Sequence, residues 1–336
     1  MNLYTTELRR IFKRRLTRIM LVLLVLGLGG IAIAFTANSH KVGPAQVAAA
    51  EARAEAEYQQ QVKYHEESVR ACEAAKAAGA GTDRYPPDCG REWTPTRDNF
   101  QAEWFMPYQF DFRDEFGNFI AIFAGIMALF GFVVGASYVG AEWHSGGMMN
   151  LLLWRPKRLT VLFTKLGALL STVLGLSLVL GALWTAAFWL IGRFDGVTGK
   201  LTSGVWQSFA LSGLRAVGLV LAVAAIAFGL ASLGRHTAMA LGVAVGVTVV
   251  SEIGIRTVMA IIGTPFGDRY VLSTYALAWF SKEWKLFDYN ACNFQQGQCA
   301  PGELVLTWQD SGLVFGVGTA VVLAAAIWAM RSRDVT

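Results

Sequence analysis

Six apolar runs, each about long enough to cross a membrane as a helix, constrain this 336-residue chain more than any other feature. They occupy residues 19–36, 118–139, 161–191, 208–233, 237–262 and 311–330. Charged residues make up only 16% of the chain, against about 25% in soluble proteins. No A-x-A-like site follows the first run, so we expect it to be retained and not cleaved as a signal peptide. The sequence therefore predicts an all-α integral membrane protein with six transmembrane helices.

Lysine and arginine residues predict the orientation of these helices. The segments on one side carry thirteen of them: Arg9, Arg10, Lys13, Arg14, Arg15, Arg18, Arg155, Lys157, Arg158, Lys165, Arg235, Arg331 and Arg333. The short loops opposite carry five: Arg193, Lys200, Arg269, Lys282 and Lys285. The positive-inside rule then places both termini in the cytoplasm and the chain in the plasma (inner) membrane as a multi-pass protein. Because the basic residues flank membrane spans, nucleic-acid binding is a poor interpretation of the net charge of +5.

The four cysteines favour the same orientation. Cys72 and Cys89 lie in the long segment 37–117, and Cys292 and Cys299 lie in the segment 263–310. Both segments are assigned to the outside, where an oxidising environment permits disulfides. We predict the pairs Cys72–Cys89 and Cys292–Cys299. A zinc site is a weak alternative, because neither pair has the short spacing or the nearby histidines of a structural zinc site.

Three segments outside the spans are predicted to contain helices. Residues 1–18 have an apolar stripe opposite a face of arginines, which is typical of a helix lying in the cytoplasmic interface. The extracellular region 37–117 has strong helix propensity over 45–78, followed by glycine and proline breakers and an aromatic stretch over 93–119 that leads into the second span. The extracellular segment 263–310 should hold a short helix between Tyr270 and Trp284, followed by a small Cys292–Cys299 loop.

Three ionisable residues stand out inside predicted spans, where such residues are costly and often functional. Arg215 is in span 208–233, and Glu252 and Arg256 share one helix face of span 237–262 because they are four residues apart. All three fall in the outer half of the membrane and could meet. A structural ion pair between adjacent helices, a substrate path or outer gate, and a proton relay all remain open. Separately, Gly131/Gly135 and Gly242/Gly246 have the spacing that lets helices approach closely.

The polar and basic connector 140–160 follows the second span, and two sequence segments carry a family likeness. The first is Glu7-Leu-Arg-Arg-Ile-Phe-Lys-Arg-Arg15, which runs into the first span. The second is Glu142-Trp143-His-Ser-Gly146 with the later residues Leu153, Pro156, Arg158 and Lys165. With six spans and an interfacial helix, the chain resembles the ABC-2 type transporter permeases. It departs from their pattern at Gly147, where threonine is usual.

The resemblance implies a permease that pairs as a dimer on two separate ABC ATPase subunits, with the connector 140–160 as the coupling helix. Met148, Met149, Leu151, Leu152 and Leu153 would offer the apolar docking surface, beside the aromatic Trp143. Glu142, Arg155, Lys157 and Arg158 would make contacts at its polar rim, and Pro156 would end the short helix. No cofactor is expected in this chain. ATP and Mg are expected on the partner ATPase, since the chain has no P-loop motif.

Three functions follow from these patterns. The first is the permease subunit of an ABC transporter, an exporter, which is not itself an enzyme. The second is an ABC-like membrane component that transmits force or signal to the extracellular region without transport. The third is a membrane enzyme that uses Glu252, Arg215 or His144, although His144 has too few neighbouring ligands for a metal or acid–base site. The sequence does not name the substrate, and it leaves homodimer and heterodimer open.

Overall fold

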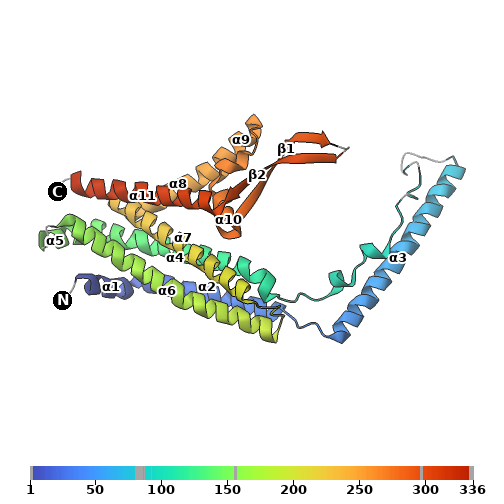
Figure 1. Ribbon diagram of the computed structural model, residues 1–336, viewed down its shortest axis with the longest axis horizontal. Coiled ribbons are helices and arrows are strands. Elements are labelled where there is room, and N and C mark those ends of the chain that lie inside the picture. Colours follow the sequence, from blue (N-terminus) through green and yellow to red (C-terminus); the bar gives the residue numbers. More distant parts are fainter. Residues whose placement is uncertain are drawn as a thin grey trace. The chain divides into compact units, whose positions relative to one another are not determined.

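A computed structural model describes residues 3–79, 86, 88–91, 93–154, 157–295 and 298–332, without the side chains of 289–300 (Figure 1). The helices within this part are α1 (Leu3–Lys13), α2 (Arg15–Asn38), α3 (Pro44–Ala77), η2 (Arg97–Asn99), η3 (Ala102–Phe105), α4 (Phe112–His144), α5 (Gly147–Trp154), α6 (Arg158–Phe194), α7 (Ser203–Gly234), α8 (Thr237–Thr248), η4 (Val249–Ile255), α9 (Arg256–Ile262), η5 (Gly267–Tyr270), α10 (Leu272–Ser281) and α11 (Trp308–Ser332). The strands are β1 (Glu283–Gln295) and β2 (Gln298–Thr307).

Within the described residues, six helices are long and apolar enough to cross a membrane: α2, α4, α6, α7, the run α8–η4–α9, and α11. Each contains one of the six predicted apolar runs. The fifth is not a regular α-helix, because Val249–Ile255 forms the π-helical turn η4 in its middle. Many of the leucine, isoleucine and valine side chains on these helices are exposed, as expected for surfaces that face lipid and not a protein core.

The chain divides into two compact units, which are described separately. Unit 1 holds residues 1–31, 113–187 and 200–336, and unit 2 holds residues 32–112 and 188–199. In unit 1, α1 and α5 lie at the same end of the bundle as the two chain termini (Figure 1). We name this end the α5 end.

Glycines on α4 allow a close helix crossing in unit 1. A Cβ atom at Gly131 would lie 3.3 Å from the Cβ of Ala224 on α7, and one at Gly135 would lie 2.8 Å from the Ala224 carbonyl oxygen. The predicted close contact at Gly131/Gly135 is therefore present. Gly242 and Gly246 on α8 are different, because a Cβ atom at either position would meet no atom within 4 Å.

In unit 2, the segment that follows the long helix α3 runs back along it and packs against it. The Cys72–Cys89 disulfide joins the end of the helix to that segment, and the two Cα atoms are 5.7 Å apart. Further along, Arg97 pairs with Glu55, while the ring of Phe100 packs 5.9 Å from that of Tyr58. The helix matches the predicted span 45–78 within one residue at each end.

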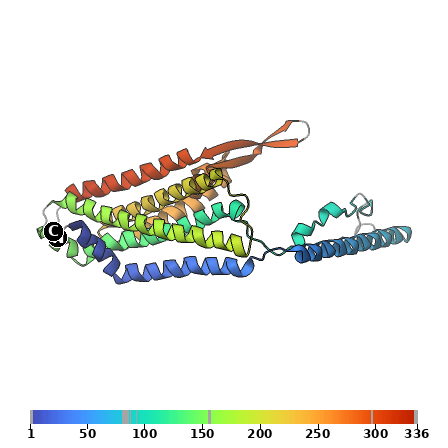
Figure 2. The ribbon, with the colours of Figure 1, turned by 60° about the horizontal axis from the view of Figure 1, so that its bottom comes forward.

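The described residues are mostly helical, as the predicted all-α fold requires, but the segment after span five also contains a β-hairpin that was not predicted. The predicted short helix is present as α10, but β1 and β2 follow it as an antiparallel pair in place of a small loop. Leu286 and Leu306 are buried against Ala278 of α10, and this apolar contact holds the hairpin. Figure 2 shows the hairpin continuing beyond the end of α11. The side chains of Cys292 and Cys299, and so their predicted disulfide, lie outside the described residues.

Candidate functional site

The site begins where α1 meets α2. A single helix over 1–18 was predicted, but α1 ends at Lys13 and α2 begins at Arg15. Arg14 lies at the break, and its guanidinium donates to the carbonyl of Ser137 on α4 at 3.0 Å. The buried residues of α1 are Glu7 and Ile11, which lie one turn apart on the same face. The buried face of α1 therefore includes a glutamate, whereas the sequence predicted a buried face of apolar residues only.

Glu7 forms a buried ion pair with Lys165 of α6. The Lys165 Nζ and Glu7 Oε2 atoms are 2.8 Å apart, and both side chains have an exposed fraction of 0%. Tyr138 of α4 donates its hydroxyl to the same carboxylate oxygen at 2.5 Å. The Lys165 Nζ also lies 4.9 Å from the centre of the Tyr138 ring. Helices α1, α4 and α6 are thus joined through one carboxylate.

Glu142 extends this set of contacts toward the connector. Its Oε2 atom is 2.7 Å from the Lys165 Nζ, and its Oε1 atom accepts from Arg14 at 2.6 Å. Both oxygens are therefore used inside the chain, so Glu142 does not stand at an outer rim as predicted. We name Glu7, Arg14, Tyr138, Glu142 and Lys165 the junction cluster.

The charge balance of the junction cluster fixes its ionisation. Burial disfavours the charged form of Glu7, but hydrogen bonds from Lys165 and Tyr138 and the charges of Lys165 and Arg10 outweigh it. The pKa of Glu7 is consequently lowered below its usual value of 4.5. The ionised Glu7 carboxylate then forms an ion pair with Lys165 in which neither side chain is exposed.

The end of α4 is also held by the turn between α7 and α8. A Cβ atom at Gly140 would lie 2.5 Å from the backbone nitrogen of Thr237, so only glycine fits there. The Arg235 guanidinium lies 4.9 Å from the centre of the Trp143 ring. The rings of His144 and His236 lie 5.0 Å apart, edge to face. The last turn of α4 therefore packs between the junction cluster and the α7–α8 turn.

Helix α5 follows directly, and its burial differs from the prediction. Gly146 has a φ of +70°, a left-handed conformation that ends α4 and suits glycine. Met148 and Leu152, predicted to dock a partner, are buried inside the chain, while Met149 and Leu151 are half-buried. Leu153 and Trp154 have exposed fractions of 81% and 87%. The outward apolar surface of α5 thus consists of these last two residues.

Three rim residues of the connector remain to be placed. Arg155 and Pro156 lie outside the described residues. Lys157 is exposed, and Arg158 is the first residue of α6. The exposed end of α5 is therefore followed, at Lys157, by an exposed basic residue.

The predicted cluster of Arg215, Glu252 and Arg256 forms only in part. Glu252 and Arg256 lie 3.7 Å apart on the fifth span. Arg215 does not join them, because its guanidinium donates to Ser212 at 2.9 Å and its carbonyl accepts from Trp279. Helix α10 contacts both spans, which were expected to meet each other at this level.

Glu252 serves instead as a cap for α10. One carboxylate oxygen accepts from the Ser273 backbone N–H at 2.8 Å, and the other accepts from the Ser273 hydroxyl at 2.7 Å. Ser251 accepts from the Leu272 N–H in the same way. These contacts satisfy backbone donors that the first turn of a helix leaves unpaired. These contacts differ from the predicted ion pair between adjacent spans, because Glu252 and Arg256 lie on the same span and Glu252 bonds to α10.

Comparison with known proteins decides the family. The sequence profile described as ABC-2 family transporter protein matches residues 1–328. The chain belongs to the ABC-2 family of transporter proteins. Comparisons with curated proteins and with solved structures found no match. Family membership makes the chain a multi-pass membrane protein and implies an ABC ATPase as its partner.

Sequence reasoning found some members of the junction cluster in this ABC-2 chain and missed how they combine. Glu7, Glu142 and Lys165 were all part of the family likeness, but they were not expected to touch one another. Arg14 was counted as an orientation signal and as part of the basic segment before the first span, and Tyr138 was counted only as part of a span. A lysine four residues into a span at 161–191 was the available signal, because a buried cation needs an anionic partner.

The buried pair generates a stability prediction for this ABC-2 chain. Lys165→Met leaves two carboxylates without their shared cation, so we expect it to lower the free energy of unfolding by about 3–5 kcal/mol. Arg10→Ala is the control, since its pair with Glu7 is half-exposed and should contribute less than about 1 kcal/mol. SDS unfolding of both variants, of Glu7→Gln and of the Glu7→Gln/Lys165→Met double variant measures the coupling between Glu7 and Lys165. Additive effects of the two cluster changes would contradict the assignment.

The lowered pKa of Glu7 generates a second prediction. Because the folded pKa lies below the usual value of 4.5, the ionised carboxylate stabilises the fold fully above that value. The contribution is lost as the pH falls below it and through the folded pKa. The difference in free energy of unfolding between the wild type and Glu7→Gln should therefore be constant near neutral pH and shrink on acidification. A difference that grows toward low pH would be the opposite sign and would exclude the pair.

Proposed function

We propose that this chain is the permease subunit of an ABC exporter and couples ATP hydrolysis on separate ATPase subunits to movement of a substrate across the membrane. The observation that carries the proposal is α5 itself, in a chain of the ABC-2 family. It is a short helix at the α5 end of the bundle (Figure 1). Its Leu153 and Trp154 side chains are exposed. Large exposed apolar residues outside the spans are typical of a protein interface.

The geometry supports a route from α5 to the spans. Met148 and Leu152 anchor α5 in the chain, and α4 leads into it. Because Glu142 and Lys165 tie α4 to α6 and Glu7 ties both to α1, a push on α5 would move these helices together. In this proposal, closure of the ATPases pushes on α5. The helix bundle has two arrangements, and the state of the ATPases determines which one is populated.

The remaining features of the proposal concern topology and assembly. We propose that the α5 end faces the cytoplasm, in agreement with its lysine and arginine excess. ATP and Mg would bind the two partner ATPases and not this chain. A second permease chain, identical or related, would complete the complex. The open space beside Gly242 and Gly246 and the exposed Val245 on α8 suit close packing of such a chain.

A second function is favoured by one observation. Unit 2 contains the 34-residue helix α3 tied to its returning chain by a disulfide, which is a large structured region for a transport subunit. A component that transmits force to a partner outside the membrane would use such a region. Removal of 44–105 would abolish that function, whereas transport would continue with altered selectivity.

The docking surface can be tested by affinity purification of the full chain in mild detergent. We expect a P-loop ATPase to co-purify with the wild type. The variant Leu153→Ala/Trp154→Ala should weaken its binding by about thirtyfold or more, because truncation of a central interface tryptophan costs at least about 2 kcal/mol. Trp104→Ala is the matched control, since Trp104 is an exposed tryptophan of η3 in unit 2.

Two results would count against this proposal. Absence of any ATPase with the wild type would remove the permease assignment. Retention of the ATPase by the α5 variant at wild-type affinity would leave the family assignment intact but place the docking surface elsewhere.

A further inference from the structure

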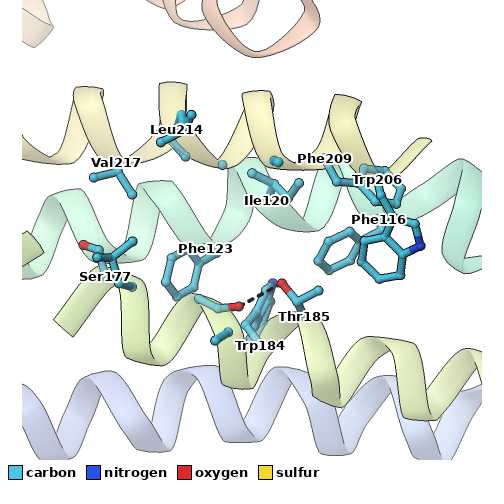
Figure 3. A pocket seen from close by; sticks show the side chains of 16 residues that line it. Phe116, Ile120, Phe123, Ser177, Trp184, Thr185, Trp206, Phe209, Leu214 and Val217 are labelled. Atoms are coloured by element: carbon cyan, nitrogen blue, oxygen red, sulfur yellow. Dashed lines mark hydrogen bonds between the residues drawn. The ribbon is translucent and has the colours of Figure 1, made fainter. Parts of the chain in front are cut away.

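A cavity of about 500 Å³ lies within the bundle, between α4, α6 and α7 (Figure 3). All of its lining residues belong to unit 1 and to the three membrane-spanning helices. Its volume is in the range of pockets that enclose a small organic molecule, about 300–1,000 Å³. Neither the junction cluster nor the cap of α10 contributes to it, so it is separate from the sites described above.

Aromatic rings form much of the wall. Phe116 and Phe123 come from α4, Trp184 comes from α6, and Trp206 and Phe209 come from α7. Figure 3 shows the rings of Phe116, Trp206 and Phe209 gathered at one end of the cavity, with Ser177 and Val217 at the other. Rings of this kind pack against flat apolar groups through offset or edge-to-face contacts.

Ser177 is the polar group of the wall that has no partner. Its side chain has an exposed fraction of 2%, and its hydroxyl makes no hydrogen bond to any described residue. Two other polar side chains of the wall are paired within the chain: Thr185 donates to the Gly181 carbonyl at 2.8 Å, and Trp184 donates to the Phe119 carbonyl at 3.1 Å. Buried hydroxyls are nearly always paired, so this one calls for a partner from outside the chain.

The cavity is elongated and reachable from the side of the bundle. Its α7 wall runs from Trp206 to Val217, which corresponds to about 16 Å along the helix. Leu178 and Leu214 line it and have exposed fractions of 56% and 65%. A molecule dissolved in the membrane could therefore enter between α6 and α7 without crossing the aqueous ends.

We propose that this cavity binds an uncharged, ring-containing apolar molecule with one hydrogen-bonding carbonyl or amide group, which Ser177 recognises. The rings of the ligand would lie among the aromatic side chains, and its polar atom would accept from the Ser177 hydroxyl. A plain lipid tail fits the wall less well, because it has no polar atom that could accept from the Ser177 hydroxyl. Binding at this site does not depend on the proposed transport function, since it requires only this chain.

Gly213 provides a way to close the cavity without disturbing the fold. It lines the cavity, and a Cβ atom there would meet no atom within 4 Å. Gly213→Leu should therefore fill the space with little strain. Gly318→Leu on α11 is the matched control, because Gly318 also has open space around it and lies outside the cavity.

The test is photolabelling of the purified full chain in lipid nanodiscs with benzophenone, which has two rings and one carbonyl. Peptide mass spectrometry should find saturable labelling concentrated in 177–185 and 206–217. Gly213→Leu should reduce it at least about fivefold, and Gly318→Leu should leave it unchanged. Ser177→Ala should weaken apparent affinity about threefold to tenfold, as expected for one lost hydrogen bond. Benzanilide, which has two rings and an amide, should compete for the site.

Two outcomes would overturn the proposal. Labelling spread over the lipid-facing residues, non-saturable and insensitive to Gly213→Leu, would show that the cavity binds nothing of this class. Competition by hexadecane as strong as that by benzanilide, with no effect of Ser177→Ala, would show a site for a plain hydrocarbon chain. A melting temperature for each variant within the wild-type range ensures that loss of labelling is not loss of fold.

Discussion

Lys165 is a fully buried ammonium group, and its need for negative partners organises the α5 end of this protein. An isolated buried charge is strongly destabilising, whereas one held by well-placed carboxylates is tolerated. Glu7 and Glu142 provide these partners from α1 and α4, at 2.8 and 2.7 Å. Neither helix can leave α6 without exposing this charge to an apolar environment. Arg14, at the break after Lys13, adds a further contact by donating to Glu142.

In the proposed function, this constraint allows the connector to transmit movement to the spans. An apolar helix on a flexible tether could bind an ATPase but would not transmit its movement. Here α5 follows a last turn of α4 that is held by the junction cluster on one side and by the α7–α8 turn on the other. The exposed Leu153 and Trp154 can then bind a partner while Met148 and Leu152 remain anchored. Glu142 contributes by fixing α4 through its contacts with Lys165 and Arg14.

The sequence predicted those parts of the fold that depend on local patterns. Apolar runs gave the six spans, helix propensity gave α3 within one residue at each end, and the predicted Cys72–Cys89 pair is bonded in the structure. The hairpin of β1 and β2 was missed, because alternation around Leu304 and Leu306 is short and was outweighed by the aromatic helix before it. The π-helical turn was missed as well; it contains Ser251 and Glu252, whose partners Leu272 and Ser273 are 21 residues away in the sequence. Contacts between residues far apart in sequence, such as Glu7 with Lys165, carry no local signal.

The most direct test of the central claim is hydrogen exchange of the purified chain, compared between the wild type and Lys165→Met. If the junction cluster holds α1, α4 and α6 as one unit, amides of α1 and of residues 137–144 should exchange faster together in the variant, by at least about tenfold. Amides of α11 should be unchanged, which excludes general unfolding. Wild-type protection of α1 in the variant would contradict the account, because the helix would then be held by contacts other than the buried lysine.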